Sequence, residues 1–359
     1  MIALPLPAAR RSGSRPAATR FAVIWGAAAF ALLAAPAWAD SVTPRGEPTI
    51  PGTITAGDRS ELTIKPATDP AETVPAAEIA EVSWDGEPAT MGAARGREGR
   101  GDLVGALEVY REAAPKMASI GPLAKADGQF LVARVLGKLA LNDPARRAEA
   151  VASLQQFVKD YPDHFRTDPA LRMLVDVQTA AGELDAAAAT LEQLKQSPSE
   201  EFQTAAAVAE GQLALKRNEA DAALSAFDSV LQNAEGRAAA EAKIGRAAAL
   251  TRLNRHDEAL TVLEGVLDET DASDAELRAA AHVGRGESLQ ATGETKPAIL
   301  EYLKVDVLYS GASAAHAESL YHLSRLWATV GLPERAAEAA AKLKTNYPNS
   351  DWAGKLSAG

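Results

Sequence analysis

The stretch Asn254-Arg-His-Asp-Glu-Ala-Leu260 decides the fold, because the chain repeats its pattern. In each copy a small residue is followed five positions later by Ala or its equivalent and then by an apolar residue. A second clear copy is Asn218-Glu-Ala-Asp-Ala-Ala-Leu224, and the most degenerate copy is centred on Ala150. The copies are spaced 36 to 44 residues apart, and each contains one of the following alanines: Ala106, Ala150, Ala187, Ala223, Ala259, Ala298 and Ala336. A period of this length is the sequence signature of a solenoid of stacked helical units.

Each position of the pattern has a physical role. A Gly or Asn at its start, such as Asn254, tolerates a positive φ and ends the first helix of a pair. The alanine lies where the second helix crosses the first, and a bulky side chain there would overpack the crossing. Apolar residues four and seven positions later, such as Leu263 and Val266, continue the buried face of the second helix. The pattern therefore predicts about seven helix-turn-helix units.

These units resemble the tetratricopeptide repeat (TPR) family over residues 89–352, about three-quarters of the chain. The resemblance includes small residues before the turns and prolines that end helices: Gly211, Ala247, Gly286, Ser324, Pro162 and Pro348. It implies a mainly α protein in which paired helices stack into a right-handed superhelix, with the first helix of each pair lining a concave groove. We expect a TPR α-solenoid over residues 89–359.

A groove of this kind would bind an extended or helical segment of a protein partner. Projecting the family's rule onto the sequence gives seven candidate partner-binding residues: Arg172, Asp176, Gln212, Glu287, Tyr321, His322 and Arg325. Aromatic residues and Arg are the usual hot spots of interfaces, which favours Tyr321 and Arg325. The alternative for that segment is an end cap that shields the last hydrophobic layer. Tyr302 and Trp327 fall on core positions, where packing explains them.

The first 39 residues read as a signal peptide. Four Arg precede a 13-residue apolar stretch, Phe21–Leu33, and Ala37-Trp38-Ala39 fits a cleavage site before Asp40. Cleavage would leave a periplasmic or secreted protein with no stable membrane span. The alternative is an uncleaved anchor, because Phe21–Ala39 has 19 residues and approaches membrane-spanning length.

A small β module is predicted between the signal peptide and the repeats. Residues 40–48 are rich in Pro and Gly and are expected to form a linker, while residues 49–88 contain four short β-rich runs separated by turns. A single helical turn is expected at Pro75–Ile79, before the last strand. This order resembles a small SH3-like or Sm-like barrel. A module of this size buries little core, so we expect it to serve as a structural cap or a partner-docking element.

Composition excludes several classes of function. The net charge of −11, which becomes −15 without the four Arg of residues 1–39, argues against nucleic acid as a partner. The absence of Cys excludes disulfides and thiol chemistry. No two of the five His have the i,i+4 spacing of a helical metal site, and no phosphate loop or nucleophile elbow is present. We therefore expect no enzyme, no cofactor and no metal.

The endings Tyr161-Pro162-Asp163 and Tyr347-Pro348-Asn349-Ser350 look like those of exported repeat proteins of Gram-negative envelopes. That resemblance implies a non-enzymatic adaptor in the periplasm. Alternative hypotheses are an envelope-assembly or wall-synthesis factor and a purely structural spacer. Neither the partner nor the oligomeric state follows from the sequence.

Overall fold

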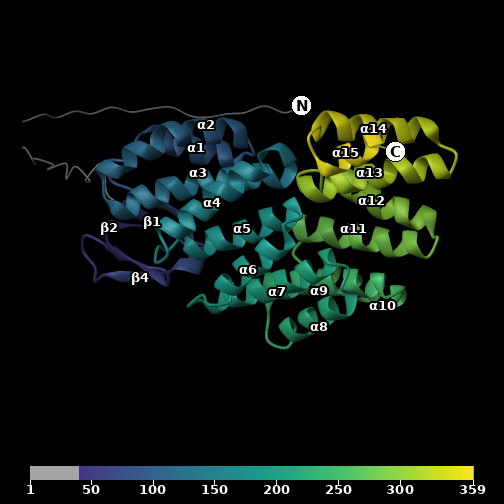
Figure 1. Ribbon diagram of the computed structural model, residues 1–359, viewed down its shortest axis with the longest axis horizontal. Helices are drawn as coiled ribbons and strands as arrows, with labels where there is room; N and C mark the ends of the chain where they lie inside the picture. The colour runs from purple at the N-terminus through teal and green to yellow at the C-terminus, as the bar shows by residue number, and fades with distance from the viewer. Residues whose placement is uncertain (1–39, 359) are drawn as a thin grey trace, which may run out of the picture. The chain divides into compact units, whose positions relative to one another are not determined.

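Seven pairs of helices form the repeat array in the computed structural model, which describes residues 40–358 (Figure 1). The predicted signal peptide, residues 1–39, lies outside the described residues. The pairs are α1 (Thr90–Gly99) and α2 (Leu103–Ala113), α3 (Pro122–Asn142) and α4 (Arg147–Asp160), α5 (Thr167–Ala181) and α6 (Leu184–Leu194), α7 (Glu200–Lys216) and α8 (Ala220–Val230), α9 (Gly236–Arg252) and α10 (His256–Glu269), α11 (Ala275–Ala291) and α12 (Thr295–Leu308), and α13 (Ser313–Thr329) and α14 (Pro333–Asn346). A last helix, α15 (Asp351–Ala358), follows them. The predicted fold class is confirmed.

The repeat pattern has the predicted local roles. Its small turn residue has a positive φ in six of the seven units: Gly101, Gly182, Asn218, Asn254, Gly293 and Gly331. The seven alanines lie on the second helices of the pairs, and none is more than 9% exposed. The second unit differs, because Asp143 begins the short 3-10 helix η3 (Pro144–Arg146) with an extended backbone.

Large side chains of the second helices fill spaces left by glycines of the first helices. The Phe227 ring of α8 lies between Gly211 of α7 and Gly245 of α9, where an added Cβ would come within 2.6 and 2.2 Å of ring carbons. The Tyr302 ring of α12 lies in the same way against Gly286 of α11, 2.7 Å from the position of an added Cβ. The repeat therefore needs its small residues for aromatic packing.

The first helices of successive pairs form one layer. In the order α5, α7, α9, α11, α13, each packs against the next as well as against its own partner, and Figure 1 shows α5, α7, α9 and α11 side by side. The second helices α6, α8, α10, α12 and α14 have no comparably extensive contacts with one another. Because the first helices approach each other more closely, their layer forms the inner, concave side of the stack, as predicted.

The β module is a five-stranded antiparallel sheet in the order β4-β3-β2-β1-β5. Its elements are β1 (Asp40–Pro44), β2 (Ile50–Gly57), β3 (Glu61–Lys65), β4 (Glu72–Pro75), the 3-10 turn η1 (Ala76–Glu78) and β5 (Ile79–Ser83). The last strand returns to pair with the first after the predicted helical turn, as in the SH3-like arrangement that the sequence resembles. The small β module is therefore confirmed.

The prediction of a linker over residues 40–48 is wrong for Asp40–Pro44, which form β1 at an interior position of the sheet. The single apolar residue of this stretch, Val42, is fully buried. Pro44 is accommodated because the pairing with β5 is irregular between Thr43 and Pro44, and prolines within sheets are confined to such irregularities and to edges.

The second unit and the end of the array are bridged, although they are far apart in the sequence. Arg147 Nη2 at the start of α4 lies 2.6 Å from Asp351 Oδ2 of α15, across 204 residues of sequence. Asn349 Nδ2, just before α15, donates to Asp143 Oδ2 at 3.4 Å. This bridge connects parts of the described array that lie far apart along the chain.

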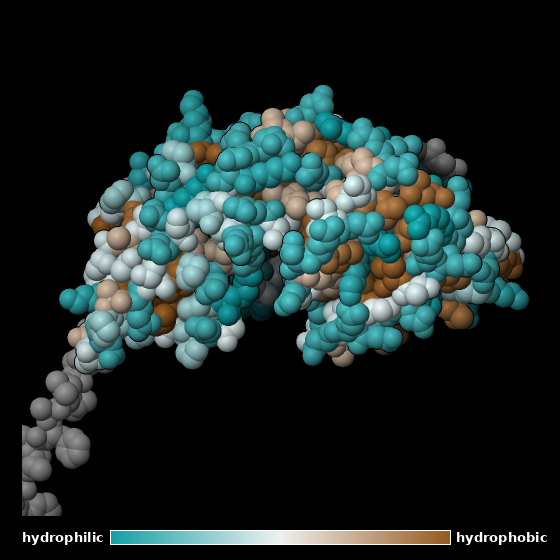
Figure 2. Space-filling model, turned by 90° about the horizontal axis from the view of Figure 1, so that it is seen from below, coloured by the Kyte–Doolittle hydropathy of each residue, from teal (hydrophilic) through white to brown (hydrophobic). Residues whose placement is uncertain are grey.

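The surface is mostly hydrophilic. Figure 2 shows that, on one face, hydrophobic surface gathers on the half that carries the C-terminal helices. The most exposed large apolar residues, Leu300, Val307 and Leu308 at 59–71%, belong to α12. Within residues 40–358 no helix combines the length and the apolar character needed to cross a membrane.

Candidate partner-binding groove

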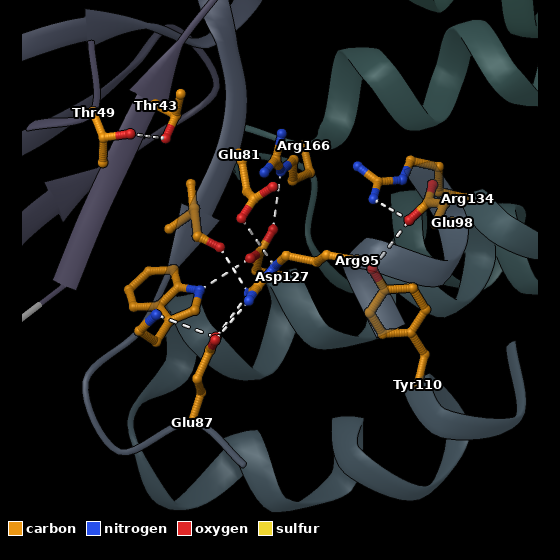
Figure 3. Close-up of polar contacts among 12 residues, drawn as sticks. Thr43, Thr49, Glu81, Glu87, Arg95, Glu98, Tyr110, Asp127, Arg134 and Arg166 are labelled. Carbon is orange, nitrogen blue, oxygen red and sulfur yellow. Dashed lines mark hydrogen bonds and ion pairs between the residues drawn. The ribbon is translucent and has the colours of Figure 1, made fainter. Parts of the chain in front are cut away.

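A buried ionic network joins the β module to the repeats (Figure 3). Trp84, which follows β5, donates from Nε1 to Asp127 Oδ2 of α3 at 2.9 Å, and Arg166 Nε donates to Asp127 Oδ1 at 2.9 Å. Asp127 is fully buried and Arg166 is 4% exposed. Burial would raise the pKa of Asp127, but the Arg166 charge and these hydrogen bonds outweigh it, so the pKa lies below its usual range. The pair is therefore ionised and locked between sheet and helices.

Two further sets of ion pairs lie next to this network, one around Arg95 and one around Glu98. The Arg95 guanidinium of α1 donates to both carboxylate oxygens of Glu87 at 2.6 and 2.7 Å and to the Val82 carbonyl at 2.8 Å. Glu98 accepts from Arg134 Nη2 at 2.7 Å and Lys138 Nζ at 2.8 Å, as well as from a tyrosine hydroxyl. These ion pairs connect α1 with the β module and with α3, so they help to hold the fold together.

A second contact fixes the turn between β2 and β3. Arg59 donates from Nη2 to Asp168 Oδ1 of α5 at 2.6 Å, and Ser197 Oγ donates to Asp168 Oδ2 at 2.6 Å. Asp168 is fully buried. The β module is thus attached to the first three units by side chains from two different loops, which sequence reasoning did not predict.

The groove begins next to this junction in a pocket of about 560 Å³, called here the N-terminal pocket. The β module, α3, α5, α7 and α9 all contribute to its wall. The residues that line it include Arg172, Asp176, Phe202, Arg237 and Glu241. The predicted residues Arg172 and Asp176 both line it. The structure therefore brings these two residues together in one pocket, and their role in partner binding stays a prediction.

Asp176 is the unusual group of the N-terminal pocket. Burial raises its pKa to about 6, the nearby Glu241 raises it as well, and Arg172 opposes the shift. Arg172 does not pair with Asp176; its Nη2 lies 3.4 Å from Glu241 Oε2 of α9 instead. Asp176 therefore presents a carboxylate that can accept a hydrogen bond or a positive charge from a bound molecule.

An aromatic cluster lies on α13, at the other end of the first-helix layer. His322 stacks on Tyr302 with ring centroids 4.8 Å apart, and Tyr321 lies 5.0 Å from Trp352 of α15. The Arg325 guanidinium lies 6.0 Å above the Tyr321 ring. The predicted residues Tyr321, His322 and Arg325 are thus brought together, and α15 joins them, a helix that the sequence analysis did not assign to the groove.

The remaining two predicted residues differ in their surroundings. Glu287 of α11 lies beside His322 and Glu318 of α13, with their ligand atoms within 4.8 Å of one another. Gln212 is exposed on α7, and the polar contacts of the described residues join it to neither cluster. Glu318 lies four residues before His322, which places the two side chains on one face of a helix. The sequence analysis missed Glu318 because it considered only pairs of His as metal ligands.

Comparisons with known proteins agree with this architecture. Residues 129–164 and 208–275 match the tetratricopeptide repeat family. A solved tetratricopeptide repeat protein from Parabacteroides merdae is 20% identical, with a TM-score of 0.50 over 71% of this chain and 91% of that one. No curated protein is significantly similar in sequence.

Two further solved structures are more distant. pilF of Pseudomonas aeruginosa is 16% identical, with a TM-score of 0.40 over 65% of this chain and 98% of that one. A Rap protein complexed with Competence and Sporulation Factor is 14% identical, with a TM-score of 0.49 over 74% and 77% of the two chains.

The fold and the inner helix layer define an α-solenoid with an extended concave face, the architecture of a protein-interaction scaffold. Residues 129–164 and 208–275 of this solenoid are thus tetratricopeptide repeats, and the seven helix pairs have a tetratricopeptide-repeat-like fold.

Proposed function

We propose that the protein is a non-enzymatic adaptor that binds a protein or peptide partner along its inner helix layer. The observation that carries the proposal is the N-terminal pocket, which combines an apolar wall at Phe202 with the unpaired Asp176 carboxylate. Pockets that bind ligands are mostly apolar and contain a few placed polar groups. Tyr321 and Arg325, at the other end of the same layer, add side chains of the type that dominates interface energies.

We further propose that the adaptor works in the periplasm or as a secreted protein, after cleavage following Ala39. The proposal rests on the basic and apolar segments of residues 1–39 and on the processing pattern at Ala37–Ala39. Mass spectrometry of protein purified from the envelope fraction should show an N-terminus at Asp40. A terminus before Phe21 would contradict export with cleavage.

Crosslinking inside the envelope fraction tests partner capture. A photo-crosslinking amino acid at Gln212 on α7 should yield a small set of adducts, because this position is exposed on the inner layer. The matched control is the same amino acid at Glu264, which is exposed on the second helix α10. Equal adducts from both positions, or none from either, would favour a structural spacer.

The double substitution Tyr321→Ala with Arg325→Ala should weaken capture of the crosslinked partner by about tenfold or more, because truncating an interface hot spot removes at least about 1.4 kcal/mol. The matched control is Arg335→Ala on α14, which removes another exposed Arg lying over an aromatic ring, 5.1 Å from Trp327. Binding is measured with the purified partner, and helicity by circular dichroism. Unchanged affinity in the double variant would remove this end of the groove from the interface.

The alternative is an envelope-assembly or wall-synthesis factor, which would use the same groove. The identity of the crosslinked proteins separates the two, because an assembly factor would capture outer-membrane or wall-synthesis proteins.

A further inference from the structure

Three potential metal ligands meet on the inner helix layer. Glu287 lies on α11, while Glu318 and His322 lie one turn apart on α13. One ligand atom from each side chain lies within 4.8 Å of the other two. The site thus connects two successive units through side chains that point at one another.

The imidazole of His322 is held in the orientation of a metal ligand. Its Nδ1 donates to the Oε1 atom of Gln290 at 3.1 Å, and the ring stacks on Tyr302 with an interplanar angle of 2°. The other ring nitrogen, Nε2, therefore carries the lone pair. It is buried and has no hydrogen-bond partner among the described residues. Metal-binding histidines almost always donate their second nitrogen to a fixed oxygen in this way.

The two carboxylates lack compensation in the protein itself. Burial raises the pKa of Glu318 to about 8, and the neighbouring Glu287 raises it further. Burial likewise raises the pKa of Glu287. The positive charges of Lys216, Arg252 and Lys355 act on the pair from other helices without forming a hydrogen bond to either carboxylate. Burial, Lys355 and Arg325 together lower the pKa of His322 to about 4, so the imidazole is neutral at pH 7.

We propose that Glu287, Glu318 and His322 bind a divalent transition-metal ion, with Zn²⁺ as the probe. Two carboxylate oxygens and one neutral imidazole nitrogen form a donor set that suits this class of ion. The cation would offset the repulsion between the carboxylates and give the unpartnered Nε2 atom a ligand. Three protein ligands leave an open position for water or for a side chain of another molecule. The site needs no partner protein, so it is tested independently of the adaptor function.

Isothermal titration calorimetry of the full chain, freed of metal with a chelator, tests the proposal with Zn²⁺ alone. One saturable site per chain is expected, and His322→Ala and Glu318→Gln should each abolish it. Gln290→Ala removes the hydrogen bond that orients the imidazole, together with a longer one of 3.5 Å from the Tyr302 hydroxyl, and should weaken binding about 10–100-fold. The matched control is Glu264→Gln, an exposed carboxylate of α10, which should leave the titration unchanged.

The fold of each variant and the position of the bound ion give further readouts. Circular dichroism shows whether each variant is folded. Crystals soaked with Zn²⁺ should show an anomalous peak between α11 and α13. The proposal would be overturned if the wild type gave no saturable heat in the titration. It would also be overturned if the anomalous peak lay elsewhere and Glu318→Gln bound Zn²⁺ as tightly as the wild type.

Discussion

Asp127→Ala should destabilise the junction between the β module and the repeats by about 3–5 kcal/mol, because it leaves the buried guanidinium of Arg166 without its counter-ion. The loss also removes the acceptor of the Trp84 indole hydrogen bond. Hydrogen exchange of the folded protein, followed by mass spectrometry, measures the effect locally, which suits a repeat array whose units open separately. Faster exchange is expected in β5 and α3, with α11 and α13 unchanged.

The companion variant combines Asp127→Leu with Arg166→Met. Replacing both members of a buried ion pair by apolar residues is often nearly neutral, so this variant should exchange more slowly than Asp127→Ala. As a control, Glu258→Ala removes a pair with Arg255 on the surface and should not change exchange at the junction. If the double variant were as unstable as the single one, shape complementarity would explain the junction better than charge.

The same pair gives a pH dependence with a defined sign. Because the folded pKa of Asp127 is lowered, its contribution to stability is complete above the unfolded value of about 3.9 and is lost as the pH falls through the folded value. Acid should therefore loosen the attachment of the β module in the wild type. This pH-dependent loss should be absent from the double variant with leucine and methionine.

Gly245→Ala is expected to lower the free energy of unfolding by about 1–3 kcal/mol through overpacking. The new Cβ would lie 2.2 Å from the Phe227 ring, and Gly211 holds the opposite side of that ring, so the ring has little room to move. Urea denaturation followed by circular dichroism measures the change. Replacing Phe227 by Leu in the same chain should recover part of the loss.

Gly265→Ala on α10 is the matched control for this substitution. Its added Cβ meets only Glu269 Oε1, at 3.9 Å, so the helix gains the usual advantage of Ala over Gly, about 0.5–1 kcal/mol. Both variants share this gain, and the difference between them isolates the contact with Phe227. Two variants of equal stability would show that the aromatic packing tolerates a larger neighbour.

Much of the array could be predicted because repetition makes each weak signal visible several times. A positive φ inferred from Asn254 alone would be weakly founded, but a Gly or Asn with a positive φ precedes the buried alanine in six of the seven units. The first strand was missed because Val42 is its only buried apolar residue before a Pro, which is too little signal for a strand pattern.

The site was harder to predict because its contacts join distant residues. The inner helix layer followed from the repeat register, and Arg172, Asp176, Tyr321 and Arg325 were projected onto it; their role in binding stays a prediction. The Trp84–Asp127–Arg166 network spans 82 residues and has no local sequence pattern. Glu318 was missed for a different reason, since the search for metal sites considered only His pairs.

The bridge from Arg147 to Asp351 changes how the array is expected to fray. In a linear stack the terminal units have one neighbour each, so opening starts at the ends. Here the last unit has a second neighbouring unit, because α15, which packs on α13 and α14, also pairs with α4 across 204 residues. A single exposed ion pair contributes little energy. It nevertheless connects the last unit to the second one, so the units between them form a closed ring of contacts. Stretching the solenoid would therefore require the bridge between Arg147 and Asp351 to break first.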